Sequence, residues 1–292
     1  MPAALVHTLR LPSGLLLELA EQGGLGGPTV LMLHGVTDSW RSFEPVLPFV
    51  DPAWHVIALS LRGHGASSKP ADGYTPANMA GDVAQFIAAM ELPPVVVVGH
   101  SMGATVALRL AVDHPGCVRA VAGLGTFASF RDKSDLVDWV RSTIDPLADP
   151  VPRELADEFQ RSTLAQSVTG EGEFSVSEAL IGSMTDQSLK APARVWRRGF
   201  AGLLDDDVAD GLHRVRVPVL LLHGGRDAFV PAADLTRLTA ALPQAQAHTW
   251  AGAGHAMHWE QPARFAALLG DFVGALDRPG APATEDATCS TS

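Results

Sequence analysis

The chain has 292 residues, of which 47% are hydrophobic and 18% charged, a composition that excludes disorder over the whole length. Its 21 basic and 32 acidic residues give a net charge of −11, which disfavours a nucleic-acid partner because phosphate binding needs a basic face. The apolar runs are too short to span a bilayer, and residues 1–10 lack the pattern of a signal peptide. We therefore expect no membrane partner and a cytoplasmic location.

The cysteine content agrees with that location. Two cysteines, Cys117 and Cys289, are too few for a disulfide framework. Since Cys289 lies in a weakly patterned C-terminal segment, the sequence does not favour even one bridge, as is usual in a reducing compartment.

Short apolar runs alternate with longer helical patterns along the chain. Runs of Val, Leu and Ile without polar alternation indicate strands buried on both faces, as in a mainly parallel sheet covered by helices. The predicted strands are residues 15–19, 29–33, 54–59, 95–98, 118–124, 217–222 and 247–250. The predicted helices are residues 76–90, 102–113, 232–241 and 262–276. This alternation is typical of a doubly wound α/β fold.

One long segment interrupts the alternation. Residues 128–209 contain no strand-like run, and about 80 residues are too many for a loop. We expect a helical cap at 128–209, inserted before the late strands of a core formed by 1–127 and 210–277. The tail, 278–292, is rich in Pro, Ala, Thr and Ser and is expected to be disordered.

The strongest chemical motif is Gly99-His100-Ser101-Met102-Gly103. It lies between a predicted strand and a predicted helix, which is the context of a G-x-S-x-G nucleophile elbow. The sharp turn projects the serine hydroxyl from the sheet edge, and the glycines remove side chains that would collide there. The motif therefore predicts that Ser101 is a nucleophile.

A serine hydroxyl needs a base, and the base needs an acid that fixes its tautomer. His255 follows the last predicted strand, and Asp227 follows the strand before it. The order Ser101, Asp227, His255 is the one expected when a triad is built on such a fold. His258 is the rival base, and an aspartate that merely forms a turn is the alternative reading of Asp227.

Acyl transfer also requires hydrogen-bond donors for the developing oxyanion. The backbone N–H of Met102, directly after the nucleophile, is one candidate donor. The other is the N–H of Val36, in the loop His34-Gly35-Val36 that follows the strand at 29–33. We expect His34 to support this loop by hydrogen bonding.

Together these motifs resemble the α/β-hydrolase superfamily, in its cap-bearing branch of small esterase-like serine hydrolases. The resemblance extends from about residue 15 to 276 and includes Arg62-Gly63-His64-Gly65-Ala66-Ser67 and Gly225-Arg226-Asp227. It implies an α/β-hydrolase fold with a mostly parallel, eight-stranded sheet, a lid at 128–209, and no cofactor. No metal is expected, because His255 and His258 have no further ligand cluster.

The sequence predicts a serine hydrolase that cleaves a small, apolar carboxylic ester or lactone. A carbon–carbon bond hydrolase with the same triad, and a hydrolase fold that serves as a ligand-binding or signalling module, remain open. Serine at 101 disfavours dehalogenases and epoxide hydrolases, which use an aspartate there. The candidate substrate contacts, for which core packing is an equal alternative, are Trp40, Phe127, Trp139, Trp196, Phe229 and Met257. The oligomeric state is left open.

Overall fold

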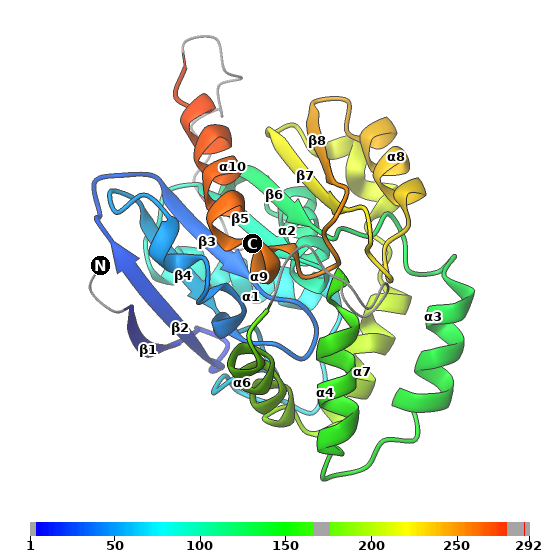
Figure 1. Ribbon diagram of the computed structural model, residues 1–292. Coiled ribbons are helices and arrows are strands. Elements are labelled where there is room, and N and C mark those ends of the chain that lie inside the picture. Colours follow the sequence, from blue (N-terminus) through cyan, green and yellow to red (C-terminus); the bar gives the residue numbers. More distant parts are fainter. Residues whose placement is uncertain (1–3, 166–175, 279–288, 290–292) are drawn as a thin grey trace.

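The computed structural model describes residues 4–165, 176–278 and 289. Within them the chain forms an eight-stranded sheet of order β1-β2-β4-β3-β5-β6-β7-β8 (Figure 1). The β1–β2 and β2–β4 pairs are antiparallel, and every pair from β4 to β8 is parallel. The strands are β1 (Leu5–Arg10), β2 (Leu16–Gly23), β3 (Thr29–Leu33), β4 (His55–Leu59), β5 (Val95–His100), β6 (Val118–Leu124), β7 (Val219–Gly224) and β8 (Ala245–Trp250). The expected mostly parallel sheet is confirmed.

The central strands are buried on both faces. In β3, Leu31 and Leu33 join one hydrophobic cluster, whereas Val30 and Met32 join another on the opposite face. Because successive side chains of a strand point to opposite faces, a strand covered on both sides contains an unbroken apolar run. This is why the central strands could be predicted from such runs.

The strand β1 was not predicted from the apolar runs. It lies at the edge of the sheet and pairs only with β2. Leu5 is 66% and Val6 46% exposed, so this strand faces solvent rather than a core. An edge strand of this kind does not need the continuous apolar run that identifies a buried one.

Helices cover both faces of the sheet. The four long helices predicted from the sequence are α1 (Pro76–Ala89), α2 (Met102–Asp113), α8 (Ala232–Ala241) and α10 (Pro262–Ala275). Apolar residues of α1, α2 and α8 belong to one core cluster and those of α10 to the other, so α10 covers the opposite face (Figure 1). The shorter helices are η1 (Trp40–Phe43), η2 (Leu47–Phe49), η3 (Pro115–Cys117) and α9 (Met257–Glu260).

The described residues between β6 and β7 are helical, as expected for the segment 128–209. They form α3 (Ser134–Trp139), η4 (Val140–Ile144), α4 (Arg153–Ser162), α6 (Glu178–Leu189), α7 (Ala193–Asp205) and η5 (Ala209–Arg214). Figure 1 shows α3, α4, α6 and α7 gathered at one side of the sheet. We refer to them together as the helical insertion.

The cysteines differ from the prediction. Cys117, fully buried just before β6, forms a disulfide with Cys289. The expectation of unpaired thiols is therefore wrong, because a contact across 172 residues leaves no trace in local spacing. The cytoplasmic expectation loses the support that it drew from free thiols.

Two other expectations concern the ends of the molecule and its setting. The tail expected to be disordered, 278–292, lies outside the described residues apart from Arg278 and Cys289. In the part of the chain that is described, helices long and apolar enough to cross a bilayer are absent.

Candidate active site

Ser101 occupies the turn between β5 and α2. Its backbone angles are φ 53° and ψ −116°, a conformation that residues other than glycine rarely adopt. The N–H of Ser101 donates to the carbonyl of Leu124 at the end of β6, over 2.9 Å. Strained backbone of this kind persists only where the surrounding structure holds it, and it is concentrated at functional sites.

The glycines on either side of Ser101 are required by close packing. A Cβ at Gly99 would lie 2.3 Å from the carbonyl oxygen of Gly103. A Cβ at Gly103 would lie 2.1 Å from the carbonyl oxygen of Leu33. The start of α2 therefore rests directly against the ends of β5 and β3, and this contact forces the sharp turn at Ser101.

Asp227 and His255 are hydrogen-bonded. The Nδ1 atom of His255 lies 2.8 Å from Oδ2 of Asp227, and both side chains are buried. The other carboxylate oxygen accepts from the N–H groups of Phe229 and Val230 at 2.8 and 2.9 Å. Because the carboxylate accepts from Nδ1–H, the Nε2 lone pair of the imidazole is left available as a base.

The surroundings of Asp227 keep it ionised. Burial alone would raise the pKa of this carboxyl group, but His255 and the two backbone N–H groups hold the pKa below its usual range. A carboxylate that stays charged is the form that can stabilise an imidazolium ion.

The imidazole of His255 lies at the same edge of the sheet as Ser101. A Cβ at Gly125 would be 2.8 Å from ring atoms of His255, and Gly125 directly follows Leu124, which binds the N–H of Ser101. The ring of His100, next to Ser101, lies 4.8 Å from the ring of His255 between centroids. Three segments far apart in the sequence thus meet at the carboxyl ends of β5, β6 and β7.

Two backbone N–H groups are candidates for an oxyanion hole. Met102 is the first residue of α2, where the N–H has no partner within the helix. Val36 lies in the loop after β3, whose last residue contacts the start of α2 at Gly103. Both donors therefore belong to backbone segments that pack against each other near Ser101.

His34 supports this loop by hydrogen bonding. Its Nδ1 lies 2.7 Å from the carbonyl oxygen of Gly35, and its Nε2 accepts from the N–H of Leu61 at 3.0 Å. Burial lowers the pKa of His34 well below its usual value, and nearby His64 lowers it further. The neutral ring bridges two backbone segments.

His258, the rival base, is enclosed in the core. Its Nε2 lies 3.1 Å from Oγ of Ser42, and the centroid of its ring lies 5.0 Å from that of Phe43. Burial and, to a smaller extent, the nearby His255 together lower its pKa to about 3. No carboxylate among the described residues orients His258 directly, which distinguishes it from His255.

The residues expected to contact substrate fall into two groups. The rings of Phe229 and Phe127 lie 5.1 and 6.1 Å from that of His255, and Trp139 stacks on Phe159 of α4, which in turn lies 6.1 Å from Phe229. The others are enclosed by packing, and they are Trp40, Trp196 and Met257.

Sequence reasoning assigned no role to several buried polar residues near the site. Glu260 accepts from the N–H of Gly254 at 2.8 Å and of Ala165 at 2.6 Å, which fixes the loop before His255. Asp38 and Gln160 hydrogen-bond each other across 122 residues. Asp38 follows Val36 closely and could have been suspected, whereas nothing in the local pattern distinguishes Gln160.

Comparisons with known proteins agree with this architecture. The alpha/beta hydrolase fold family matches residues 28–262. The chain is 30% identical to pimeloyl-[acyl-carrier protein] methyl ester esterase of Aromatoleum aromaticum, over 84% of this chain and 98% of that protein. It is 27% identical to 2-hydroxymuconate semialdehyde hydrolase of a Pseudomonas species, over 88% of this chain and 90% of that protein. The esterase EaEST of Exiguobacterium antarcticum superposes with a TM-score of 0.80 at 22% identity, covering 92% of this chain and 100% of that one. The chain belongs to the α/β-hydrolase fold family.

Proposed function

We propose that this protein is a serine hydrolase that cleaves a carboxylic ester or lactone through an acyl-enzyme on Ser101. One observation carries the proposal: the Asp227–His255 hydrogen bond of 2.8 Å lies at the sheet edge where Ser101 is held in a strained turn. A nucleophile, a base and an acid in this relation form the arrangement that activates a serine hydroxyl.

In the acylation step, Ser101 Oγ attacks the substrate carbonyl carbon while Nε2 of His255 takes the hydroxyl proton. Asp227 stabilises the resulting imidazolium and keeps its tautomer fixed. The N–H groups of Val36 and Met102 donate to the oxyanion that develops on the carbonyl oxygen. His255 then gives its proton to the leaving alcohol, and the acyl group remains on Ser101.

In the deacylation step, His255 takes a proton from a water molecule, which attacks the acyl carbon. The second tetrahedral intermediate uses the same two N–H donors, and the acid product leaves as Oγ of Ser101 regains its proton. The cycle needs no cofactor.

The aromatic rings favour an apolar substrate. Phe127 and Phe229 lie against His255, and Phe159 connects Phe229 to Trp139 in the helical insertion. We propose that the segment 128–209 acts as a lid over the core formed by 1–127 and 210–277, and that it limits substrate size.

The test is turnover across p-nitrophenyl esters of increasing chain length and a series of lactones, with Ser101→Ala beside the parent. We expect Ser101→Ala to lower kcat by at least about 10³-fold, because the nucleophile is removed. The matched control is Ser142→Ala, an exposed serine of η4, which should keep the parent rate. An alanine variant at 101 that hydrolyses the best substrate as fast as the parent would overturn the mechanism.

The similarity to 2-hydroxymuconate semialdehyde hydrolase supports a second candidate function, the hydrolysis of a carbon–carbon bond. Turnover of a vinylogous diketone without turnover of the esters would favour a carbon–carbon hydrolase that uses the same three residues. Thermal stabilisation by a ligand without multiple turnover would instead indicate a binding module.

A further inference from the structure

A buried polar cluster connects the loop after β3 to the helical insertion. Gln160 of α4 donates through Nε2 to Oδ1 of Asp38 at 2.8 Å and to Oγ of Ser188 at 2.7 Å. The same Nε2 lies 3.4 Å from Oγ1 of Thr37, which in turn lies 3.2 Å from Ser188 Oγ. We call these four residues, Thr37, Asp38, Gln160 and Ser188, the loop clamp.

The loop clamp is closed to solvent. Its residues are buried, and the helices α4 and α6 that supply two of them lie side by side (Figure 1). On its other side, Oδ2 of Asp38 accepts from Oγ of Ser42 at 3.1 Å. Within the described residues, Asp38 has no Lys or Arg partner. Its carboxyl group is stabilised instead by hydrogen bonds from two neutral side chains, Gln160 and Ser42.

The bonds of the clamp act on a strained part of the loop. Thr37 has φ +69°, in the left-handed region that a β-branched residue rarely adopts. Its N–H lies 3.3 Å from Nε2 of His64, and its hydroxyl lies within the clamp. Since such a conformation is strained, it persists only while neighbouring contacts hold it.

The strained residue lies directly after Val36, one of the two proposed oxyanion donors. If Thr37 relaxed, the peptide plane between Val36 and Thr37 would rotate, and the preceding plane, which carries the Val36 N–H, would have to turn with it. A donor stabilises the oxyanion only when it is aimed at the position where the charge develops. The hydrogen bonds of Gln160 thus influence the direction of an oxyanion donor through the backbone of the loop.

We propose that Gln160 and Asp38 are positioning residues. Through them, the oxyanion hole keeps its shape only while helix α4 is packed against the loop after β3. The inference rests on the proposed function, because it takes the Val36 N–H as an oxyanion donor. The loop keeps its shape through hydrogen bonds from the helical insertion, so a displaced α4 leaves the nucleophile in place but weakens stabilisation of the transition state.

The central variant is Gln160→Met, which keeps the length of the side chain and removes its donor. We expect kcat on the best p-nitrophenyl ester to fall about 10–100-fold, the effect of a slightly misplaced group, while KM changes less than about threefold. In Asp38→Ala, kcat should fall by a similar factor. Asp38→Asn should keep kcat within about threefold of the parent, because its amide oxygen still accepts from Gln160 and its amide nitrogen can donate to Ser42.

The control is Asp157→Asn, which lies on the same helix but is only partly buried and pairs with Arg161. It should keep the parent kcat, since it does not touch the loop. Thermal unfolding of each variant shows that it is folded at the assay temperature. A folded Gln160→Met with kcat within about twofold of the parent, or a loss of equal size in Asp157→Asn, would overturn the inference.

A fluorophosphonate ester separates this inference from the proposed function. It reacts with an activated serine and develops charge on its phosphoryl oxygen, so its inactivation rate reports both the nucleophile and the oxyanion donors. A parent that is not labelled at Ser101 would contradict the proposed function. A parent that is labelled, beside a Gln160→Met variant labelled equally fast, would contradict the inference alone.

Discussion

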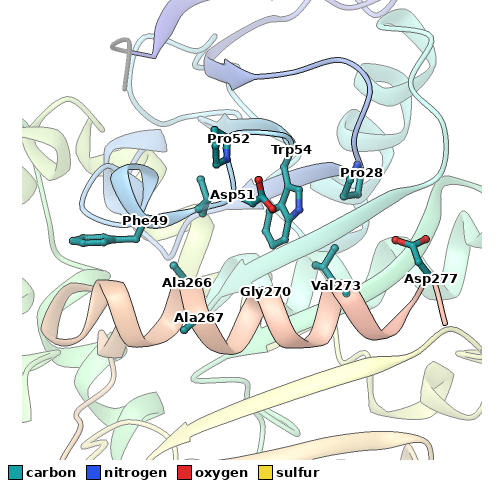
Figure 2. A pocket seen from close by; sticks show the side chains of 12 residues that line it. Pro28, Phe49, Asp51, Pro52, Trp54, Ala266, Ala267, Gly270, Val273 and Asp277 are labelled. Atoms are coloured by element: carbon teal, nitrogen blue, oxygen red, sulfur yellow. The ribbon is translucent and has the colours of Figure 1, made fainter.

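The two ends of the central sheet differ in the residues and backbone conformations that gather there. At the carboxyl ends of β5, β6 and β7, strained backbone and buried polar side chains meet around Ser101 and His255. At the amino ends of β3 and β4 lies a surface cavity of about 650 Å³ between α10 and the loop before β4 (Figure 2). The volume of that cavity is within the range of small-molecule sites, and apolar side chains, glycines and two aspartates line it. Its residues are Pro28, Phe49, Val50, Asp51, Pro52, Trp54, Ala266, Ala267, Gly270, Val273, Gly274 and Asp277.

The difference shows that volume alone does not identify an active site. Among the described residues that line the cavity at the amino ends there is no serine, cysteine or histidine, and the two carboxylates belong to Asp51 and Asp277. Asp277 is paired with Arg119. The proposed active site at the other end is distinguished by the placement of its donors, acceptors and tight turns, not by empty space.

The largest expected effect lies at the carboxyl ends. Asp227→Asn should lower kcat by about 10⁴-fold, because an amide nitrogen facing Nδ1 would favour the tautomer whose Nε2 already carries a proton. Ester turnover under saturating substrate measures the change. Asp210→Asn, an exposed aspartate of η5, is the matched control. A loss below about tenfold would remove Asp227 from the mechanism and weaken the contrast between the two ends.

A pair of glycines compares the two ends by stability. Gly103→Ala should lower the free energy of unfolding by about 2–4 kcal/mol, because the new Cβ meets the backbone carbonyl of Leu33 at 2.1 Å. Gly270→Ala, in α10 beside the cavity, meets no atom within 4 Å and should raise it by about 0.5–1 kcal/mol through helix propensity. Denaturant titration measures both. Equal effects at the two positions would contradict the contrast in packing.

A smaller effect concerns pH. Burial raises the pKa of Asp38 to about 7, although the hydrogen bonds from Gln160 and Ser42 and the nearby His255 oppose the rise. An unfolded aspartate has a pKa near 3.9, so between about pH 4 and 7 the unfolded chain releases this proton while the folded protein keeps it. Folded stability should therefore fall as pH rises through this range. No such loss can occur in Asp38→Asn.

Thermal unfolding of Asp38→Asn and the parent measures this effect. The variant should gain a few degrees over the parent at about pH 8 relative to about pH 5, because other titrating groups are common to both proteins. A difference that is the same at both pH values, or that shrinks as pH rises, would show that Asp38 is not a buried carboxyl group of raised pKa.

Much of the fold could be predicted because the strands and helices carry local signals. Val95 to Val98 are buried on both faces of the sheet, and Pro76 and Pro262 stand at the first positions of α1 and α10. The elbow at Ser101 could be predicted for the same reason, since its glycines are required by close packing within the turn itself. The exposed strand β1 has no such signal.

Long-range contacts had no local signal. The bond from Gln160 to Asp38 joins a helix of the insertion to a loop 122 residues earlier, and both residue types are ordinary at exposed positions. Their burial depends on how α4 and α6 pack over the loop, which no sequence period describes. The bridge between Cys117 and Cys289 escaped prediction in the same way.

That bridge divides the proposed catalytic groups between two topologically different parts of the chain. Asp227 and His255 lie inside the covalent ring that it closes, whereas Ser101 and Val36 lie on the open arm before it. A ring of this length restricts the conformations of the unfolded chain, and its effect on stability grows only slowly with size. While the disulfide is intact, even a denatured molecule keeps the segment that follows His255 covalently joined to Cys117, sixteen residues after the proposed nucleophile.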